Sequence, residues 1–189
     1  LHSDIAQAAV SQQFPNLGLH CSFGEDNVIK LPFHTDVTNV ILYHHENANG
    51  TGPFHKKWDE TPLFARIIHL CDLLDVMCRA TSFTTDTWQR ANDLLLKING
   101  SIADEECVHA FIQAFPEKHF LTLGDDDLDA RLWAKVPRIK QDLNFTQIKS
   151  LADFFAQIVD YKSPFTSTHS IGVAEHARKL SLFMGLEQK

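Results

Sequence analysis

The chain has 189 residues, of which 44% are hydrophobic and 22% are charged, enough for one sizeable core or for one domain and part of another. Its net charge of −7 argues against a broad nucleic-acid-binding surface, so no nucleic-acid polymer is expected as a partner. We expect no membrane span, because no apolar stretch is long enough to cross a bilayer. The four cysteines form no CxxC pair, which favours reduced thiols and a cytoplasmic protein.

Helical periodicity runs through nearly the whole chain, which predicts an all-α fold. We expect a helix over residues 1–14 and a connector over residues 15–32, where Gly, Asn and Asp interrupt the pattern. Asp36 is placed to cap a helix that runs to Ala48, and the Asn-Gly pair that follows supplies a left-handed stop. The chain starts at Leu1 inside an expected helix, so we expect it to be part of something larger.

The second half of the chain continues in the same way. Further helices are expected over residues 62–80, 86–98, 104–115, 145–161 and 168–185. The stretch 137–144 is typical of a boundary, which would divide the chain into segments 1–140 and 141–189.

Two of the eleven histidines are adjacent, at His44 and His45. On the expected helix they point toward the interior, next to a Gly-rich turn. A buried imidazole needs a partner, and a metal ion is a good one. From this helix alone, one hydrogen-bonded core histidine and one surface histidine are the favoured interpretation.

The helix expected over residues 62–80 changes that balance, because it carries Asp72 among apolar residues. A carboxylate is costly to bury unless it binds a cation or a basic side chain, so Asp72 is either a metal ligand or the partner of an arginine. His2 and His169 also share helix faces with apolar residues, near the two ends of the chain. Imidazoles and a carboxylate on separate helices are the donors with which helical bundles build iron or manganese sites.

Residues 44–53, HHENANGTGP, resemble the HHExxDGxGYP signature of HD-GYP phosphodiesterases. Residues 65–72, ARIIHLCD, resemble the helix that follows this signature, with Asp72 at its metal-ligand position. Residues 159–170, VDYKSPFTSTHS, resemble the segment that opens such a domain, with His169 as its first metal ligand. His2 looks like the ligand histidine that precedes the double histidine in this family.

This resemblance implies an HD-domain-like helical bundle and metal-dependent hydrolysis of a cyclic dinucleotide, such as cyclic di-GMP or cyclic GMP–AMP. A complete site would hold two divalent ions, iron or manganese. The implied metal ligands are His2, His44, His45, Asp72 and His169. In the same way Arg66 is implied to orient Asp72 or meet a phosphate, and Gly50, Gly52 and Lys162 are implied substrate contacts. A homodimer is a further expectation.

The order of these motifs differs from that of the family, because the double-histidine half comes first and the opening segment comes last. A tandem protein explains this order better than a circular permutation, with residues 1–140 from the back half of one HD-GYP-like domain and residues 141–189 from the front of the next. Loss of residues from the ends or the interior is a third explanation. No adjacent His-Asp dyad occurs, and Asn49 replaces the aspartate of the signature. We therefore expect a degenerate first domain and little activity from this chain alone.

The competing interpretation is a non-catalytic HD-type module for regulation or dimerisation. Asn49 and the missing dyad favour it, whereas the double histidine and Asp72 argue against a complete loss of the site. A nucleotide phosphohydrolase of the broader HD superfamily is a third alternative, which the Gly-rich turn disfavours. Metal analysis discriminates between the first two interpretations.

Overall fold

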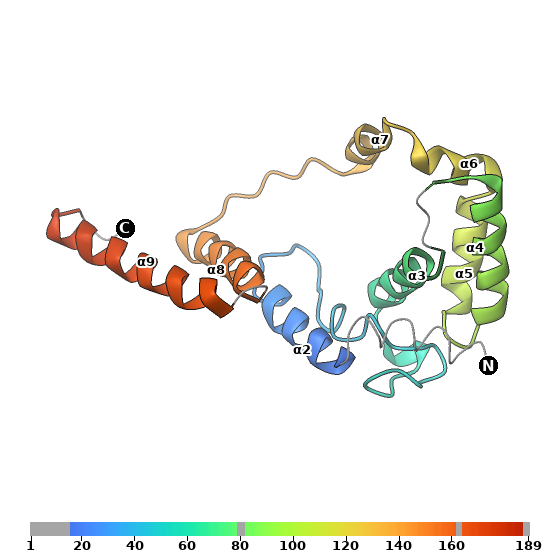
Figure 1. The fold of residues 1–189 in the computed structure, drawn as a ribbon, viewed down its shortest axis with the longest axis horizontal. Coiled ribbons are helices and arrows are strands. Elements are labelled where there is room, and N and C mark those ends of the chain that lie inside the picture. The colour runs from blue at the N-terminus through green and yellow to red at the C-terminus, as the bar shows by residue number, and fades with distance from the viewer. Residues whose placement is uncertain (1–15, 79–81, 162–163, 187–189) are drawn as a thin grey trace. The chain divides into compact units, whose positions relative to one another are not determined.

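The computed structural model describes residues 16–78, 82–161 and 164–186, which form two compact units (Figure 1). Unit 1 comprises Leu1–Asp26 and Thr35–Lys140, and unit 2 comprises Asn27–His34 and Gln141–Lys189, each within its described residues. Within these ranges the chain forms α-helices and short 3-10 helices joined by turns, and no strand occurs among the described residues. The all-α prediction is confirmed.

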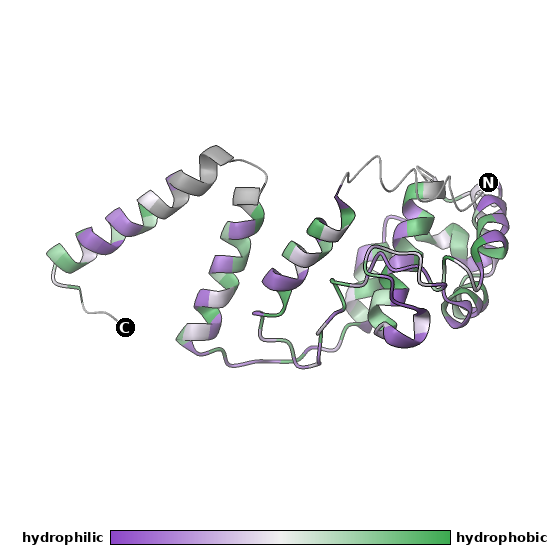
Figure 2. Ribbon diagram, turned by 90° about the horizontal axis from the view of Figure 1, so that it is seen from below, coloured by the Kyte–Doolittle hydropathy of each residue, from purple (hydrophilic) through white to green (hydrophobic). Residues whose placement is uncertain are grey.

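The core of unit 1 lies between the helices α3 (Leu63–Cys78), α4 (Thr85–Ile98) and α5 (Glu105–Ala114). Each of these helices carries both hydrophobic and hydrophilic residues, as the green and purple segments of Figure 2 show. The buried apolar side chains come from all three helices and from the α4–α5 loop: Leu70, Leu73, Leu95, Ile98, Ile102, Ala103, Cys107 and Val108. Burial of this face away from water is the main stabilising contribution to the unit.

Side-chain caps fix where two of these helices begin. Thr84 Oγ1 accepts a hydrogen bond from the backbone N–H of Thr87 at 3.3 Å, and Asp104 Oδ2 accepts one from Cys107 at the same distance. Gly100 has φ +67°, which a residue with a Cβ rarely adopts, and it separates α4 from α5. The helices predicted over residues 86–98 and 104–115 are therefore confirmed.

After α5, unit 1 continues as a short helical extension. It consists of α6 (Glu117–Leu121), the 3-10 turn η2 (Thr122–Gly124) and α7 (Leu128–Lys135). Phe120 of α6 is buried against α4, which anchors the extension to the core.

Two sequence-based predictions for unit 1 are wrong. Residues 15–32 do not form only a connector, because α2 (Leu17–Val28) is a regular helix. Residues 36–48 do not form a helix, because residues 38–45 follow a series of turns. The helix predicted for residues 1–14 lies outside the described residues.

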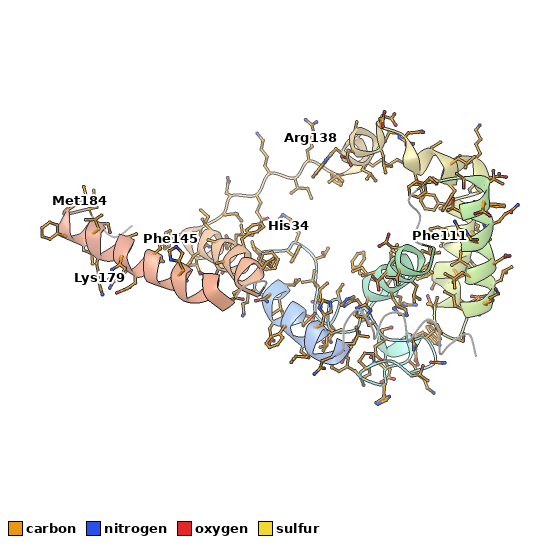
Figure 3. All side chains as sticks on the ribbon, in the orientation of Figure 1. His34, Phe111, Arg138, Phe145, Lys179 and Met184 are labelled. Carbon is orange, nitrogen blue, oxygen red and sulfur yellow. The ribbon has the colours of Figure 1, made fainter. Side chains whose placement is uncertain are left out.

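Unit 2 contains α8 (Phe145–Tyr161) and α9 (Pro164–Phe183), which pack against each other. The predicted helix over residues 145–161 is confirmed, and the last helix begins at Pro164, four residues before the predicted start. Several apolar side chains are exposed, among them Phe145 at 66% and Met184 at 65% (Figure 3). Among the described residues, no helix combines the length and apolar character that a bilayer crossing requires.

Candidate metal centre

Three imidazoles from two segments of unit 1 converge on one point. His20 projects from α2, whereas His44 and His45 lie in the turn region 38–45. One potential ligand atom from each of the three lies within 4.8 Å of the others. The ring centroids of His44 and His45 are 4.0 Å apart, and that of His20 lies 5.5 Å from that of His44. We call these three residues the histidine centre; their separation suits one divalent cation.

The turn that carries the double histidine is shaped by a carboxylate from α2. Glu25 is buried, and its two oxygens accept the backbone N–H groups of Asn39, Ile41 and Leu42 at 2.5, 3.1 and 3.0 Å. Asn39 has φ +64°, outside the helical region. The predicted helix does not form here because these N–H groups donate to Glu25. In a helix they would instead donate to backbone carbonyls of the preceding turn.

Both histidines of the turn are held in the neutral form that binds metals. His44 Nδ1 lies 2.5 Å from the backbone carbonyl of Ile41, to which it donates, so Nε2 carries the lone pair. Burial lowers the pKa of His44. Burial, with repulsion from His44, His69 and His20, lowers the pKa of His45 to about 3.

Helix α3 places two further polar side chains beside the histidine centre. His69 is buried with its ring centroid 6.5 Å from that of His45, and burial lowers its pKa to about 4. Asp72 Oδ2 lies 3.6 Å from His45 Nδ1, too far for a hydrogen bond, and burial raises the pKa of this carboxyl. His45 Nδ1 is buried and makes no hydrogen bond within the described residues. The donor set therefore fits a divalent metal, with three imidazoles and an adjacent carboxylate.

The Gly-rich loop after the double histidine is closed by another buried carboxylate. Glu46 accepts the backbone N–H groups of Phe54 and Lys56, both at 2.6 Å. A Cβ on Gly52 would lie 2.6 Å from Glu46 Cα, so only glycine fits there. Gly50 has φ +81° and turns the chain as predicted. Both glycines thus have a structural role, and their substrate contact stays a prediction.

Arg66 is engaged away from the histidine centre. Its Nη1 lies 3.0 Å from Asp104 Oδ2, and its guanidinium lies over Trp58 of η1 (Trp58–Glu60), 5.9 Å from the ring centroid. Within the described part of the chain no ion pair joins Arg66 to Asp72. Of its two predicted roles, orientation of Asp72 is not what the structure shows, and the phosphate contact stays a prediction.

The remaining three predicted site residues lie outside the described part of unit 1. His2 and Lys162 lie outside the described residues. His169 is exposed on α9, in unit 2. Conversely, His20 belongs to the centre although the sequence prediction did not include it.

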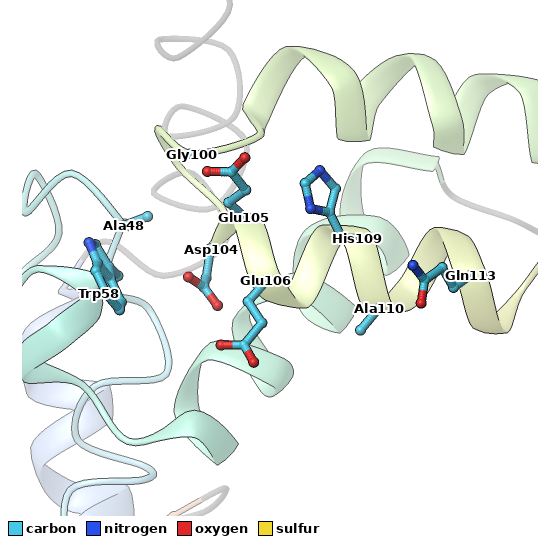
Figure 4. Close-up of a pocket in the computed structure, with 9 residues that line it drawn as sticks. All are labelled: Ala48, Trp58, Gly100, Asp104, Glu105, Glu106, His109, Ala110 and Gln113. Carbon is cyan, nitrogen blue, oxygen red and sulfur yellow. The ribbon is translucent and has the colours of Figure 1, made fainter.

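A separate cavity of about 600 Å³ opens beside the first turn of α5 (Figure 4). Trp58 and Ala48 form one side, and Asp104, Glu106 and His109 line the other. No residue of the histidine centre lines it. Its acidic wall disfavours a phosphate, so this cavity is not where we expect a phosphodiester to bind.

Comparison with known families agrees with this geometry. The family model described as HD domain matches residues 11–106, which include the whole histidine centre, His69 and Asp72. The chain belongs to the HD domain family. The expected HD-type bundle is thereby confirmed.

The chain is also similar to two curated proteins and to one solved structure. The chain is 26% identical to 3'3'-cGAMP-specific phosphodiesterase 1 of Vibrio cholerae over 97% of its own length and 44% of that protein. It is 29% identical to 3'3'-cGAMP-specific phosphodiesterase 3 of the same organism, over 86% of this chain and 36% of that one. A crystal structure of a cyclic GMP–AMP-specific phosphodiesterase of V. cholerae superposes with a TM-score of 0.69 at 28% identity, covering 87% of this chain and 40% of that one. The chain thus spans less than half the length of these relatives.

Proposed function

We propose that the chain is part of a cyclic-dinucleotide phosphodiesterase, and that its unit 1 is an HD domain that binds a divalent metal. The observation that carries this proposal is the convergence of His20, His44 and His45 within 4.8 Å, in a segment that matches the HD domain family. Asp72 would complete the donor set from α3. Iron or manganese suits such a mixture of imidazole and carboxylate donors.

The residues of the chain prepare this site before any ion binds. Burial keeps the imidazoles of His44 and His45 neutral, so both offer a lone pair without first losing a proton. The bond from His44 Nδ1 to Ile41 fixes which nitrogen faces the ion. A bound divalent cation would supply Lewis-acid chemistry for phosphodiester hydrolysis, by activating water and by neutralising charge on the phosphate.

The proposed substrate is a cyclic dinucleotide. Two relatives and the similar crystal structure carry names that specify cyclic GMP–AMP, which we place before cyclic di-GMP. A chain with net charge −7 needs a local source of positive charge to bind such an anion, and a metal ion supplies one.

For the domain organisation we propose a tandem arrangement. Residues 1–140 would form the C-terminal half of one HD-GYP-like domain, and residues 141–189 the opening helices of a second one that carries His169. The two compact units and the greater length of the relatives support this division. We therefore expect little turnover from this chain by itself. A homodimer and a cytoplasmic location stay predictions.

Metal content and turnover test the proposal together. The purified chain is loaded with Mn²⁺ or, without oxygen, with Fe²⁺, desalted and analysed by inductively coupled plasma mass spectrometry, beside the His45→Ala variant. We expect stoichiometric metal in the wild type, loss in the variant and slow or no hydrolysis of cyclic GMP–AMP. Absence of bound metal in the wild type would refute the metal role. Rapid turnover by this chain would refute the tandem division.

One observation favours the alternative, a non-catalytic HD module. Asn49 stands where the family signature has an aspartate, and its Oδ1 accepts hydrogen bonds from the backbone N–H and the hydroxyl of Thr51 at 3.1 and 2.7 Å. This side chain is therefore engaged in holding the loop. A metal-free chain that retained its fold would support the module.

A further inference from the structure

Glu25 is the one buried carboxylate that bonds the turn carrying the double histidine, among the hydrogen bonds of the described residues. We propose that Glu25 is a positioning residue of the histidine centre, which acts through the Ile41–Leu42 peptide group to fix the ring of His44. The inference rests on the proposed metal role of that centre. Glu25 itself would touch neither the metal nor the substrate.

The first step of the argument is the bonding capacity of Glu25. A carboxylate offers two acceptor oxygens and no donor, and here both oxygens are used by backbone N–H groups. The three amides belong to residues 39, 41 and 42, so they converge only because the chain leaves the helical path at Asn39. Without this acceptor the three amides would lose their hydrogen-bond partner, which is unfavourable for groups shielded from water.

The second step is the link from this turn to a ring nitrogen. Leu42 donates its N–H to Glu25 Oε2, and the Ile41 carbonyl, in the same peptide group, accepts from His44 Nδ1. The plane of one peptide group therefore connects the buried carboxylate to the imidazole. Hydrogen bonds on both sides of a peptide group polarise it and strengthen one another. This relay fixes the Nδ1–H tautomer of His44 and the direction of its other nitrogen.

The third step is the joint placement of His20. Glu25 and His20 lie on the same helix, so the bonds of Glu25 also hold α2 against the turn. Gly24 permits the close approach, because a Cβ there would lie 2.6 Å from Ile41 Cγ2. Cys21 Sγ, on the same helix, lies 3.9 Å from His44 Nδ1. One carboxylate thus fixes both the orientation of the His44 ring and its distance from His20.

The substitution Glu25→Gln isolates this role with almost no change in shape. Glutamine keeps one acceptor oxygen but presents an NH₂ group to an N–H donor, so at least one of the three bonds must break. Asp26→Asn is the matched control, since Asp26 is the next residue of α2, is exposed and loses the same charge. Glu25→Asp keeps the charge with a shorter reach and serves as a second variant if Glu25→Gln does not fold.

Two measurements on the full chain test the inference. The tautomer of His44 is read in the metal-free protein from its ¹⁵N ring shifts, and Mn²⁺ affinity is measured by calorimetry. We expect the wild type and Asp26→Asn to show the Nδ1–H tautomer and equal affinity. We expect Glu25→Gln to show a mixture of tautomers and an affinity about tenfold lower, with Glu25→Asp between the two.

The result that would overturn the inference is a Glu25→Gln variant with faster amide exchange at residues 39–42 but with the His44 tautomer and Mn²⁺ affinity of the wild type. Glu25 would then be a purely structural residue. A wild type that binds no Mn²⁺ would contradict the proposed function instead. The tautomer comparison, made without metal, would still decide whether Glu25 fixes His44.

Discussion

Unit 1 and unit 2 are both helical, yet they differ in what they bury. Unit 1 buries an apolar core and, beside it, an unusual set of polar side chains that includes His44, His45, Glu46 and His69. No residue of unit 2 whose side chain is described is buried, and the ion pairs among these residues lie on exposed helix faces. The buried core and the buried polar groups are therefore both features of unit 1.

This difference shows where a polar site can be built. Burying an imidazole or a carboxylate costs free energy, which the burial of apolar side chains in the same unit can offset. Unit 1 has that packing, so it can hold neutral histidines close together. The polar groups of unit 2 remain in water, where side-chain pairs contribute little.

The largest expected effect concerns the core. Leu95 is 0% exposed, whereas Leu180 of unit 2 is 58% exposed. Leu95→Ala should lower the free energy of unfolding by about 2–5 kcal/mol, because it leaves a cavity. Leu180→Ala should change it by about 0.5 kcal/mol or less. Urea unfolding followed by tryptophan fluorescence measures unit 1, which contains all three tryptophans, and far-ultraviolet circular dichroism follows the helices of both units. An equal loss of unfolding free energy in both variants would contradict the difference in burial between the two units.

The next effect concerns metal affinity. His44→Ala removes one of three proposed ligands, so the affinity for Mn²⁺ should fall on the order of 100-fold. His176→Ala, which removes an exposed imidazole of α9, should leave the affinity unchanged. Calorimetric titration of both variants measures this difference. A similar loss in the two variants would place the metal outside the histidine centre.

A smaller difference in stability is expected between alanine substitutions at two glycines. Gly52→Ala introduces a Cβ that lies 2.6 Å from Glu46 Cα, so we expect a loss of about 1–3 kcal/mol from unit 1. Gly172 lies inside α9 with no atom within 4 Å of an added Cβ, so Gly172→Ala should instead stabilise α9 by about 0.5–1 kcal/mol. Tryptophan fluorescence and far-ultraviolet circular dichroism follow the two changes. A gain at Gly52 would contradict the packing around Glu46.

Acid should weaken unit 1 more than unit 2. The pKa values of His45 and His69 are lowered to about 3 and about 4 in the folded chain, below the value of about 6.5 expected when unfolded. Between these values the unfolded state binds more protons, so stability falls as the pH falls below 6.5. From pH 6.5 to 5.5 each group should cost about 1 kcal/mol in the metal-free chain. His69→Gln should reduce this slope, and His176→Gln should not; fluorescence-detected unfolding at several pH values measures it.

Much of the fold could be predicted from the sequence, because α4, α5 and α8 carry local signals. Thr84 and Asp104 are caps, Gly100 is a helix stop, and the apolar spacing of residues 145–161 matches one helix face. These features depend on residues within a few positions of each other. The structure therefore agrees with them almost residue by residue.

The candidate site was predicted only in part, for a physical reason. Glu25 lies on the buried face of α2 together with Cys21, so the sequence of this helix has no apolar stripe. Its pattern therefore predicts a connector. The Glu25 carboxylate bonds amides 14 to 17 residues further along, and this non-local bonding turns an apparent helix at residues 36–48 into a turn. His20 was missed with α2. The polar residue on its buried face was the signal that could have revealed it.

X-ray absorption at the manganese edge of the loaded chain tests the central claim most directly, because it identifies the atoms around the ion. If His20, His44 and His45 bind the metal, the spectrum should show scattering from several imidazole rings, and His20→Ala should remove one of them. A spectrum with oxygen ligands alone, unchanged in His20→Ala, would contradict the assignment of a metal site to the histidine centre.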